Sequence, residues 1–348
     1  MRSKRLSCPS DFTRSARAAF VFIILACVFL GSASAPGLCQ TDVARPNADA
    51  GPTSIHVKMY LADFFKVSAA DQTFQADVVI IAEWMDPRLA GRWVGIHKAA
   101  ISEVWSPNLQ LLNQRTVTSY LPGNVEIDPS GMVRWRQRFI GNFSVRMDLR
   151  DFPFDRQRFG IQAVSMGYGR DEVDLIADPD QSNRSRNLSI TDWNVGPVRI
   201  ETADFEPAPG AKVQSGAQLS WEARRYIGYH IVNVMLPLVL IVLMGGATPW
   251  LDPTIVPARI SMAMTTMLTL IAYRFTLGAS VPALTYLTRF DYFMLASTII
   301  VFLILILVVA DAHLMTKQRL ALVQRIDRWA NTAFPLVLAS VLLVAWWW

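Results

Sequence analysis

One stretch of the sequence decides the fold: Pro257-Ala258-Arg259-Ile260-Ser261-Met262-Ala263-Met264-Thr265-Thr266-Met267-Leu268-Thr269-Leu270. It lies within a segment long enough to cross a membrane, yet small or hydroxylated residues recur along it. Three of them, Ser261, Thr265 and Ala272, fall together with Leu268 at spacings of three or four residues. Such spacing puts them on one face of a helix. Because polar side chains at bilayer depth are costly unless they meet water or a partner, the pattern predicts a membrane helix with one face toward water.

Four hydrophobic segments fill the second half of the chain, at about 226–246, 256–277, 290–313 and 329–348. Each runs for roughly 20 residues, which is enough to span a hydrocarbon core of about 30 Å. The last ends in Trp346-Trp347-Trp348, a composition typical of the membrane interface. We therefore expect a transmembrane domain over 226–348.

Residues 54–225 have the pattern of a soluble β domain. Short runs of alternating apolar and polar residues are bounded by turns, as in the run 74–81 and the turn Asp128-Pro129-Ser130-Gly131. Many short strands at such spacing predict an immunoglobulin-like β-sandwich. The sandwich is expected to lie outside the cytoplasm, since the chain begins with an export signal.

The export signal is predicted over residues 1–35. A basic start precedes an apolar core at 18–30, and Ala33-Ser34-Ala35 fits a cleavage site, although Pro36 is unfavourable just after it. A retained membrane anchor is the alternative. Removing 1–35 lowers the formal net charge from +5 to +1, so the basicity does not indicate nucleic-acid binding. Residues 36–53 are expected to form a flexible lead-in.

Other classes of site find no support in the sequence. The three cysteines, Cys8, Cys27 and Cys39, all precede the sandwich, so no disulfide is expected within it. We find no nucleotide-binding loop, zinc spacing or nucleophile triad, and expect no enzyme, cofactor or metal. Between the third and fourth segments, four basic residues face one acid, as the positive-inside rule requires of a cytoplasmic loop. They are Lys317, Arg319, Arg325 and Arg328, against Asp327.

Five motifs, in order, are similar to those of one family. They are Trp84-Met85-Asp86-Pro87-Arg88-Leu89, Trp105-Ser106-Pro107, Asp148 with Phe152-Pro153-Phe154-Asp155-Arg156-Gln157, Arg225 twelve residues before Pro237, and Pro282. With the predicted sandwich and four spans, they resemble the pentameric ligand-gated ion channels, or Cys-loop receptors. The resemblance covers nearly the whole mature chain and implies a cyclic homopentamer that passes inorganic ions. One helix cannot enclose a pore, so assembly around an axis is expected in any case.

The chain departs from the family at the two cysteines that name it, which would fall at Val145 and Phe159. It also has no room for a cytoplasmic domain. Both departures resemble the bacterial branch, which implies a multi-pass protein of the bacterial inner membrane with its sandwich in the periplasm.

The resemblance assigns the pore to the second span. The positions that would face the lumen are Pro257, Ser261, Thr265, Leu268, Ala272, Phe275 and Ala279. Leu268 would form an apolar ring that gates by dewetting, unless it simply packs between helices. Pro257-Ala258-Arg259 is similar to the mouth of glycine and GABA receptors, and its arginine favours chloride. The alternative is a cation-selective channel of the same family, for which protons are a candidate agonist.

Coupling between the domains is implied at the base of the sandwich. Asp155 and Arg225 resemble a buried pair that joins the domains, and a purely structural salt bridge is the alternative. The loop before Pro282 would receive the movement. Asp71 is the nearest candidate for an acidic partner on the first hairpin.

The agonist site is less well defined. The matched aromatic-box positions are Val79, Leu112 and Met166, and only Tyr168 and Phe205 are aromatic nearby, so an amine agonist is not supported. On the strand around Arg136, alternation places Arg134, Arg136 and Arg138 on one face. Arg136 and Arg138 resemble the positions that hold a carboxylate in glycine-type receptors. An anionic or zwitterionic ligand is therefore one hypothesis, a solvated basic strand is its alternative, and protons are a further candidate agonist.

Two rival classes remain. A membrane-anchored sensor that does not conduct would need a cytoplasmic output domain. A membrane enzyme would need convergent titratable residues within the spans, whereas Asp311 and His313 lie together only near the end of one.

Overall fold

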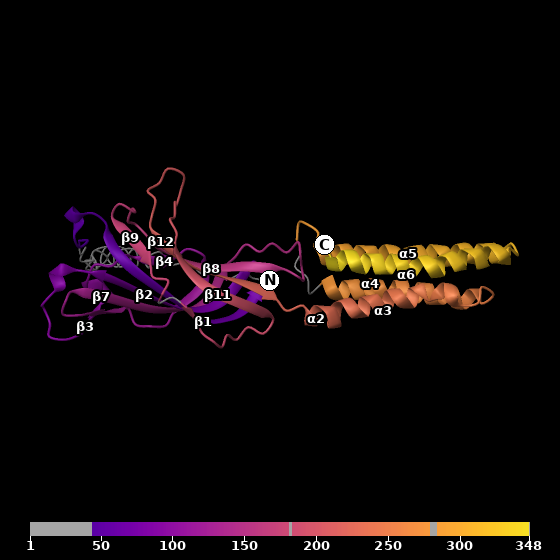
Figure 1. The fold of residues 1–348 in the computed structure, drawn as a ribbon, viewed down its shortest axis with the longest axis horizontal. Coiled ribbons are helices and arrows are strands. Elements are labelled where there is room, and N and C mark those ends of the chain that lie inside the picture. Colours follow the sequence, from indigo (N-terminus) through magenta and orange to yellow (C-terminus); the bar gives the residue numbers. More distant parts are fainter. Residues whose placement is uncertain (1–43, 181–182, 279–283, 348) are drawn as a thin grey trace, which may run out of the picture. The chain divides into compact units, whose positions relative to one another are not determined.

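Alternating apolar residues build a β-sandwich in the first half of the chain. The computed structural model describes residues 44–180, 183–278 and 284–347 (Figure 1). Its strands are β1 Thr53–Ser68, β2 Thr73–Met85, β3 His97–Ala100, β4 Leu109–Leu111, β5 Gln114–Ser119, β6 Asn124–Ile127, β7 Met132–Ser144, β8 Arg156–Ser165, β9 Val173–Ala177, β10 Asn183–Arg184, β11 Trp193–Thr202 and β12 Gly216–Arg225. The helices are α2 Gly228–His230, α3 Leu236–Gly246, α4 Val256–Gly278, α5 Arg289–Thr316 and α6 Leu320–Trp347, with a π-helix at Ile231–Met235. The predicted leader lies outside the described residues.

Within this part of the chain the strands form two sheets. One has the order β10-β1-β2-β7-β6-β3, with β5 also paired to β7 and β9 to β1, and the other has the order β11-β12-β8-β4. The period of two is clearest on β2, where Val78, Ile80 and Ala82 are buried and the residues between them are partly exposed. The predicted β-sandwich is confirmed.

Aromatic side chains fill the space between the two sheets. Phe64 of β1 and Phe74 of β2 meet Phe159 of β8 and Trp221 of β12, with ring centroids 5.0–6.1 Å apart. Each fully buried ring contributes about 1.5–3 kcal/mol relative to an exposed one. Phe159 occupies one of the two positions where the resemblance expects a cysteine, so packing between the sheets takes the place of a crosslink there.

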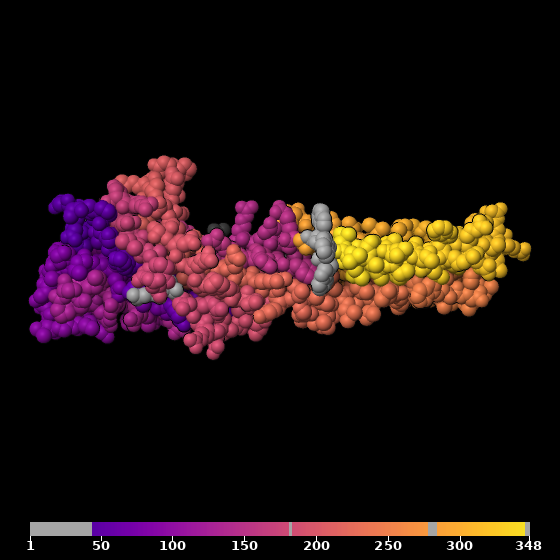
Figure 2. All heavy atoms as spheres, in the orientation of Figure 1, coloured from indigo at the N-terminus to yellow at the C-terminus, as the bar shows by residue number. Residues whose placement is uncertain are grey.

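The second half of the chain is a helical bundle in which α4 contacts α3 and α5, and α5 contacts α6. Figure 2 shows the surfaces of α5 and α6 (yellow) lying against those of α3 and α4 (orange). Thr288 starts α5 through a capping box: its hydroxyl accepts the Asp291 N–H while the Asp291 carboxylate accepts the Thr288 N–H.

Three of the four predicted spans are found among the described residues by length and apolar composition. Three described helical segments are long and apolar enough to cross a membrane: Gly228–Trp250, Val256–Leu277 and Arg289–Thr316. The fourth segment does form a helix, but α6 begins at Leu320 and so includes Arg325, Asp327 and Arg328 in its first turns. The apolar part of α6 follows these charges and runs to the end of the described chain, so the fourth span stays a prediction.

Pro237 sits at the second residue of α3 and cannot donate a backbone hydrogen bond. The turn before it is the π-helix Ile231–Met235, and the hydroxyl of Tyr273 on α4 donates to the carbonyl of Val234 at 2.8 Å and approaches that of Asn233 at 3.4 Å. A neighbouring helix thereby satisfies backbone groups beside the proline, which is how a proline is tolerated in a membrane helix.

Candidate functional site

The polar stripe of α4 lies on the exposed face of that helix. Six of the predicted lumen positions are exposed: Pro257, Ser261, Thr265, Leu268, Ala272 and Phe275. The opposite face is buried among the other helices through Ala263, Thr266 and Leu270. Leu268 is 69% exposed, so in this single chain it does not pack between helices. Ala279 lies outside the described residues.

The first half of this face forms an open groove of about 740 Å³, lined by Val256, Pro257, Ile260, Ser261, Met264, Thr265 and Leu268. The hydroxyl groups of α4 differ in whether they are already hydrogen-bonded. Thr266 and Thr269 donate to the carbonyls of residues four positions earlier, at 2.9 and 2.8 Å. Within the described chain the side-chain hydroxyls of Ser261 and Thr265 form no hydrogen bond, so their O–H groups can turn toward a passing ion.

Arg259 does not share the exposed face. Its side chain is 2% exposed and its Nη2 atom lies 2.5 Å from Asp327 Oδ1 of α6 and 3.3 Å from Asp311 Oδ2 of α5. Two residues from Ser261 correspond to about 200° around a helix, which turns Arg259 into the bundle. The expectation that Arg259 acts on ions together with Pro257 and Ala258 is therefore corrected: the latter two are exposed, whereas the guanidinium is buried against carboxylates.

The Asp155–Arg225 pair is buried and geometrically complete. Arg225 donates from Nε to Asp155 Oδ1 at 2.8 Å and from Nη2 to Oδ2 at 3.2 Å, and Gln157 donates to Oδ2 at 2.9 Å. The guanidinium lies over the rings of Trp193 at 4.2 Å and Phe152 at 5.1 Å. Two parallel hydrogen bonds and two cation–π contacts fix this arginine where β12 leads into the first membrane helix.

Loop 145–154 carries further contacts to the helical region, and the sequence analysis did not single out their partners. Leu149 donates its N–H to the Tyr286 hydroxyl at 3.0 Å. Arg289, the first residue of α5, pairs with Asp151 at 2.8 Å. Phe152 packs edge-to-face on His230. The residue types of Tyr286, Arg289 and His230 mark them as possible contact residues. Their pairing with loop 145–154 depends on the fold and could not be predicted from the sequence. Pro282 lies outside the described residues.

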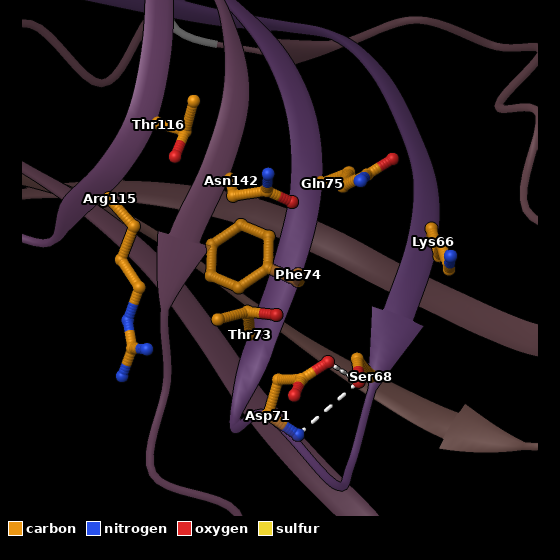
Figure 3. A pocket seen from close by; sticks show the side chains of 9 residues that line it. All are labelled: Lys66, Ser68, Asp71, Thr73, Phe74, Gln75, Arg115, Thr116 and Asn142. Carbon is orange, nitrogen blue, oxygen red and sulfur yellow. Dashed lines mark hydrogen bonds between the residues drawn. The ribbon is translucent and has the colours of Figure 1, made fainter. Parts of the chain in front are cut away.

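Asp71 does not join the Asp155–Arg225 pair. It accepts a hydrogen bond from the Ser68 hydroxyl at 2.7 Å within its own β1–β2 turn. Figure 3 shows Asp71 at one end of a polar pocket of about 340 Å³, with Lys66 and Arg115 also on its wall. Because the turn is short, the Asp71 carboxylate binds the nearby Ser68 and does not reach Arg225.

The predicted ligand-site residues fall into two groups on different sheets. Val79, Arg136 and Arg138 lie on β2 and β7 of the larger sheet. The other four follow strands of the smaller sheet: Leu112 after β4, Met166 and Tyr168 after β8, and Phe205 after β11. The Tyr168 hydroxyl is already engaged by Trp105 Nε1 at 3.1 Å. One chain therefore does not bring the two groups together.

The three arginines of β7 share a face, as the alternation predicts, but differ in their partners. Arg134 pairs with Glu83, which also binds Lys58. Burial opposes ionisation of Glu83, but hydrogen bonds from Lys58 and Arg134 outweigh it and lower the pKa of this carboxyl. Arg138 donates three bonds to Asp77, and this pairing raises the pKa of the guanidinium. Arg136, between them, is exposed and has no ion pair within the described chain.

A long loop between β11 and β12 projects from the sandwich (Figures 1 and 2). Ion pairs connect it to the segment after β8. Asp204 pairs with Arg170, and Lys212 lies 3.5 Å from Asp171. Phe205 and Gln214 bridge the two sides of the loop. The loop thus holds Phe205 on the same side of the molecule as Tyr168.

Comparisons with known proteins agree with this arrangement. The family model of the neurotransmitter-gated ion-channel ligand binding domain matches residues 41–206. A proton-gated ion channel of Gloeobacter violaceus is 23% identical over 302 residues, which cover 84% of this chain and 82% of that channel. Gamma-aminobutyric acid receptor subunit beta-4 of Gallus gallus is 22% identical over 274 residues, covering 75% of this chain and 55% of that subunit.

A β-sandwich continued by apolar helices, one of which exposes a hydroxyl-bearing stripe, defines a membrane receptor built around a channel. The chain belongs to the pentameric ligand-gated ion channel family, the Cys-loop receptors, which are not enzymes.

Proposed function

We propose that the chain is a subunit of a homopentameric ligand-gated ion channel of the bacterial inner membrane, with its sandwich in the periplasm and α4 lining the pore. The exposed stripe of α4 carries this proposal. Hydroxyl side chains exposed along a membrane helix are costly unless they meet water or a partner, and one helix cannot enclose a lumen. Copies of the chain around an axis would close it. The number five and the bacterial setting rest on the family.

Gating is assigned to Leu268. Its exposed side chain lies between Thr265 and Ala272, and a ring of such leucines would exclude water from a narrow lumen. Asp155, Arg225 and the contacts of loop 145–154 would transmit movement of the sandwich to the helices. Replacing Leu268 by Thr, which is smaller and polar, is expected to raise the open probability. Closed-state dwell times in single-channel records that match those of the unaltered channel would reject this role.

Chloride selectivity is proposed on three features. Between Val256 and Gly278, α4 contains no carboxylate, and the positive end of its dipole lies near Pro257. Ser261 and Thr265 have hydroxyl donors free for an anion. The reversal potential in a lipid bilayer under a tenfold NaCl gradient tests this directly. Reversal near the chloride potential supports it, whereas reversal near the sodium potential selects the alternative, a cation channel.

That alternative has its own support. The Gloeobacter violaceus relative is described as a proton-gated ion channel, and Asp311 and Asp327 place more acid than base behind the start of α4. Stepping pH during the same recording separates proton gating from ligand gating. A protein that assembles but passes no current under any of these conditions is instead a non-conducting sensor.

For the agonist we propose a small anionic or zwitterionic molecule held by Arg136. Of the three arginines on that face, Arg134 and Arg138 are neutralised by Glu83 and Asp77. An unpaired guanidinium suits a carboxylate, and residues near Tyr168 and Phe205 of a neighbouring copy would complete the site. Binding of small carboxylates to Arg136→Ala decides the point. Arg115→Ala, another exposed arginine on the same sheet, is the matched control, and equal affinity in Arg136→Ala and the unaltered protein rejects the site.

A further inference from the structure

Three ionisable side chains from three helices meet inside the bundle. Arg259 of α4, Asp311 of α5 and Asp327 of α6 are 2%, 2% and 5% exposed. One nitrogen of the guanidinium, Nη2, contacts both carboxylates, at 2.5 Å to Asp327 and 3.3 Å to Asp311. We call these three residues the buried triad.

The buried triad has more acid than base. With every group ionised it carries a formal charge of −1 in each chain. No other charged side chain of the described helices is buried, so none balances this charge inside the bundle. The remaining polar atoms of the buried triad also lack a hydrogen-bond partner in the described chain: Arg259 Nε and Nη1, both Asp311 oxygens and Asp327 Oδ2. The charged groups nearest in sequence are exposed, namely His313 and Lys317 at the end of α5, Arg325 and Arg328 on α6, and Asp252 before α4.

The buried triad also lies directly behind the first turn of the exposed stripe. Arg259 is two residues from both Pro257 and Ser261 and points to the other side of the helix. Charges in a protein interior are screened less than charges in water, so the triad's field reaches this end of the groove. A ring of copies would add these fields around the lumen.

We infer that Asp311 and Asp327 are specificity-determining residues of the channel, which act through Arg259. They hold its guanidinium away from the lumen, outweigh its charge and thereby limit the preference for anions at the start of α4. The inference rests on the proposed function, since it concerns the ion that α4 admits. Removing one carboxylate leaves a neutral pair, and removing both leaves an uncompensated cation.

The test is a series of reversal potentials under a tenfold NaCl gradient. Asp311→Asn and Asp327→Asn keep the side-chain shape and each remove one negative charge per subunit. Each is expected to move the reversal toward the chloride potential, with a severalfold rise in the chloride-to-sodium permeability ratio, and the double variant to raise it about tenfold. Adding Arg259→Gln to Asp327→Asn restores the charge of −1 and is expected to return the reversal to that of the unaltered channel.

Asp252→Asn is the matched control, since it makes the same charge change just before α4 but at an exposed position where solvent screens it. Asp311→Asn is the primary variant, because the oxygens of Asp311 accept no hydrogen bond and assembly is expected to survive. Unchanged reversal in assembled, conducting variants, loss of current from intact oligomers, or a larger shift in Asp252→Asn overturns the inference. Absence of current from the unaltered protein rejects the proposed function itself.

Discussion

Two buried arginines, one at the base of the sandwich and one at the start of α4, are held in opposite ways. Arg225 meets a single carboxylate through two hydrogen bonds and is covered by two aromatic rings. Arg259 meets two carboxylates through one nitrogen and leaves its other two without a partner in the described chain. The first arrangement is balanced in charge and rigid, which suits transmission of movement. At Arg259, by contrast, replacing one of the two carboxylates changes the local charge more than it changes the position of the arginine.

The largest effect is expected from Asp155→Asn. This change leaves Arg225 buried without its counter-charge, and breaking a buried pair on one side costs about 3–5 kcal/mol of unfolding free energy. Thermal unfolding of the detergent-solubilised protein, followed by circular dichroism, measures it. A loss below about 1 kcal/mol would mean that the aromatic rings alone hold the arginine.

Substituting lysine at both arginines tests the comparison directly. Arg225→Lys gives up one of two charge-assisted hydrogen bonds and the stacking on Trp193, at an expected cost of about 2–3 kcal/mol. Arg259→Lys keeps a single donor near both carboxylates and is expected to cost about 1 kcal/mol or less. The two variants serve as each other's control in the same unfolding assay. Equal costs would remove the distinction between the two sites.

Moving one carboxylate without changing any charge sharpens the comparison further. A Cβ on Gly246 of α3 would lie 2.0 Å from the ring of Phe334 on α6. Gly246→Ala is therefore expected to push α6, and Asp327 with it, away from α3, at about 1–3 kcal/mol. Adding Phe334→Leu should recover part of the loss, and a Gly246→Ala protein as stable as the parent would contradict the close contact of the two helices.

A smaller effect is expected from Glu83, whose arginine partner is exposed. The folded-state pKa of Glu83 lies below its ordinary value of 4.5, so its pairing stabilises the fold above that pH and is lost as pH falls through the lowered pKa. Glu83→Gln should cost about 0.5–1 kcal/mol at neutral pH and nothing in strong acid. Unfolding midpoints from pH 7 down to pH 3 test this, and a cost that stays constant over that range would exclude the ion pairs as its source.

The smallest effect on stability belongs to Leu268, despite its proposed role in gating. Since its side chain is 69% exposed, Leu268→Thr should change the unfolding free energy of the single subunit by no more than about 0.5 kcal/mol. Unfolding of subunits separated in detergent, compared with that of the assembled protein, provides the measurement. A large loss in separated subunits would show that Leu268 packs within one chain.

Features set by local spacing could be predicted from the sequence. Alternation identified the sandwich and the shared face of the three β7 arginines, and the three-to-four spacing identified the exposed stripe of α4. Arg225 was found together with Asp155 because both occur in motifs of the family. In each case the information lies within one helix, one strand or one motif.

Features that depend on partners distant in sequence could not be predicted from the sequence. Asp327 is 68 residues from Arg259, and nothing in the residues around Arg259 indicates that carboxylates of α5 and α6 meet it. Asp71 is close in sequence to the expected hairpin position, but its turn gives it a nearer partner in Ser68. The helix α6 begins before the predicted apolar segment 329–348, because hydropathy marks the apolar part of a helix and not where its hydrogen bonds begin.

The π-helix ahead of Pro237 stores one surplus residue. A π turn holds about one residue more than an α turn, which amounts to about 100° of rotation along a helix. Arg225 fixes the chain on one side of this turn, while Leu238 and Val242 fix it by packing on the other. Deleting one residue within Ile231–Met235 would convert the π turn to an α turn and leave Arg225 and the packed residues of α3 attached on either side of it.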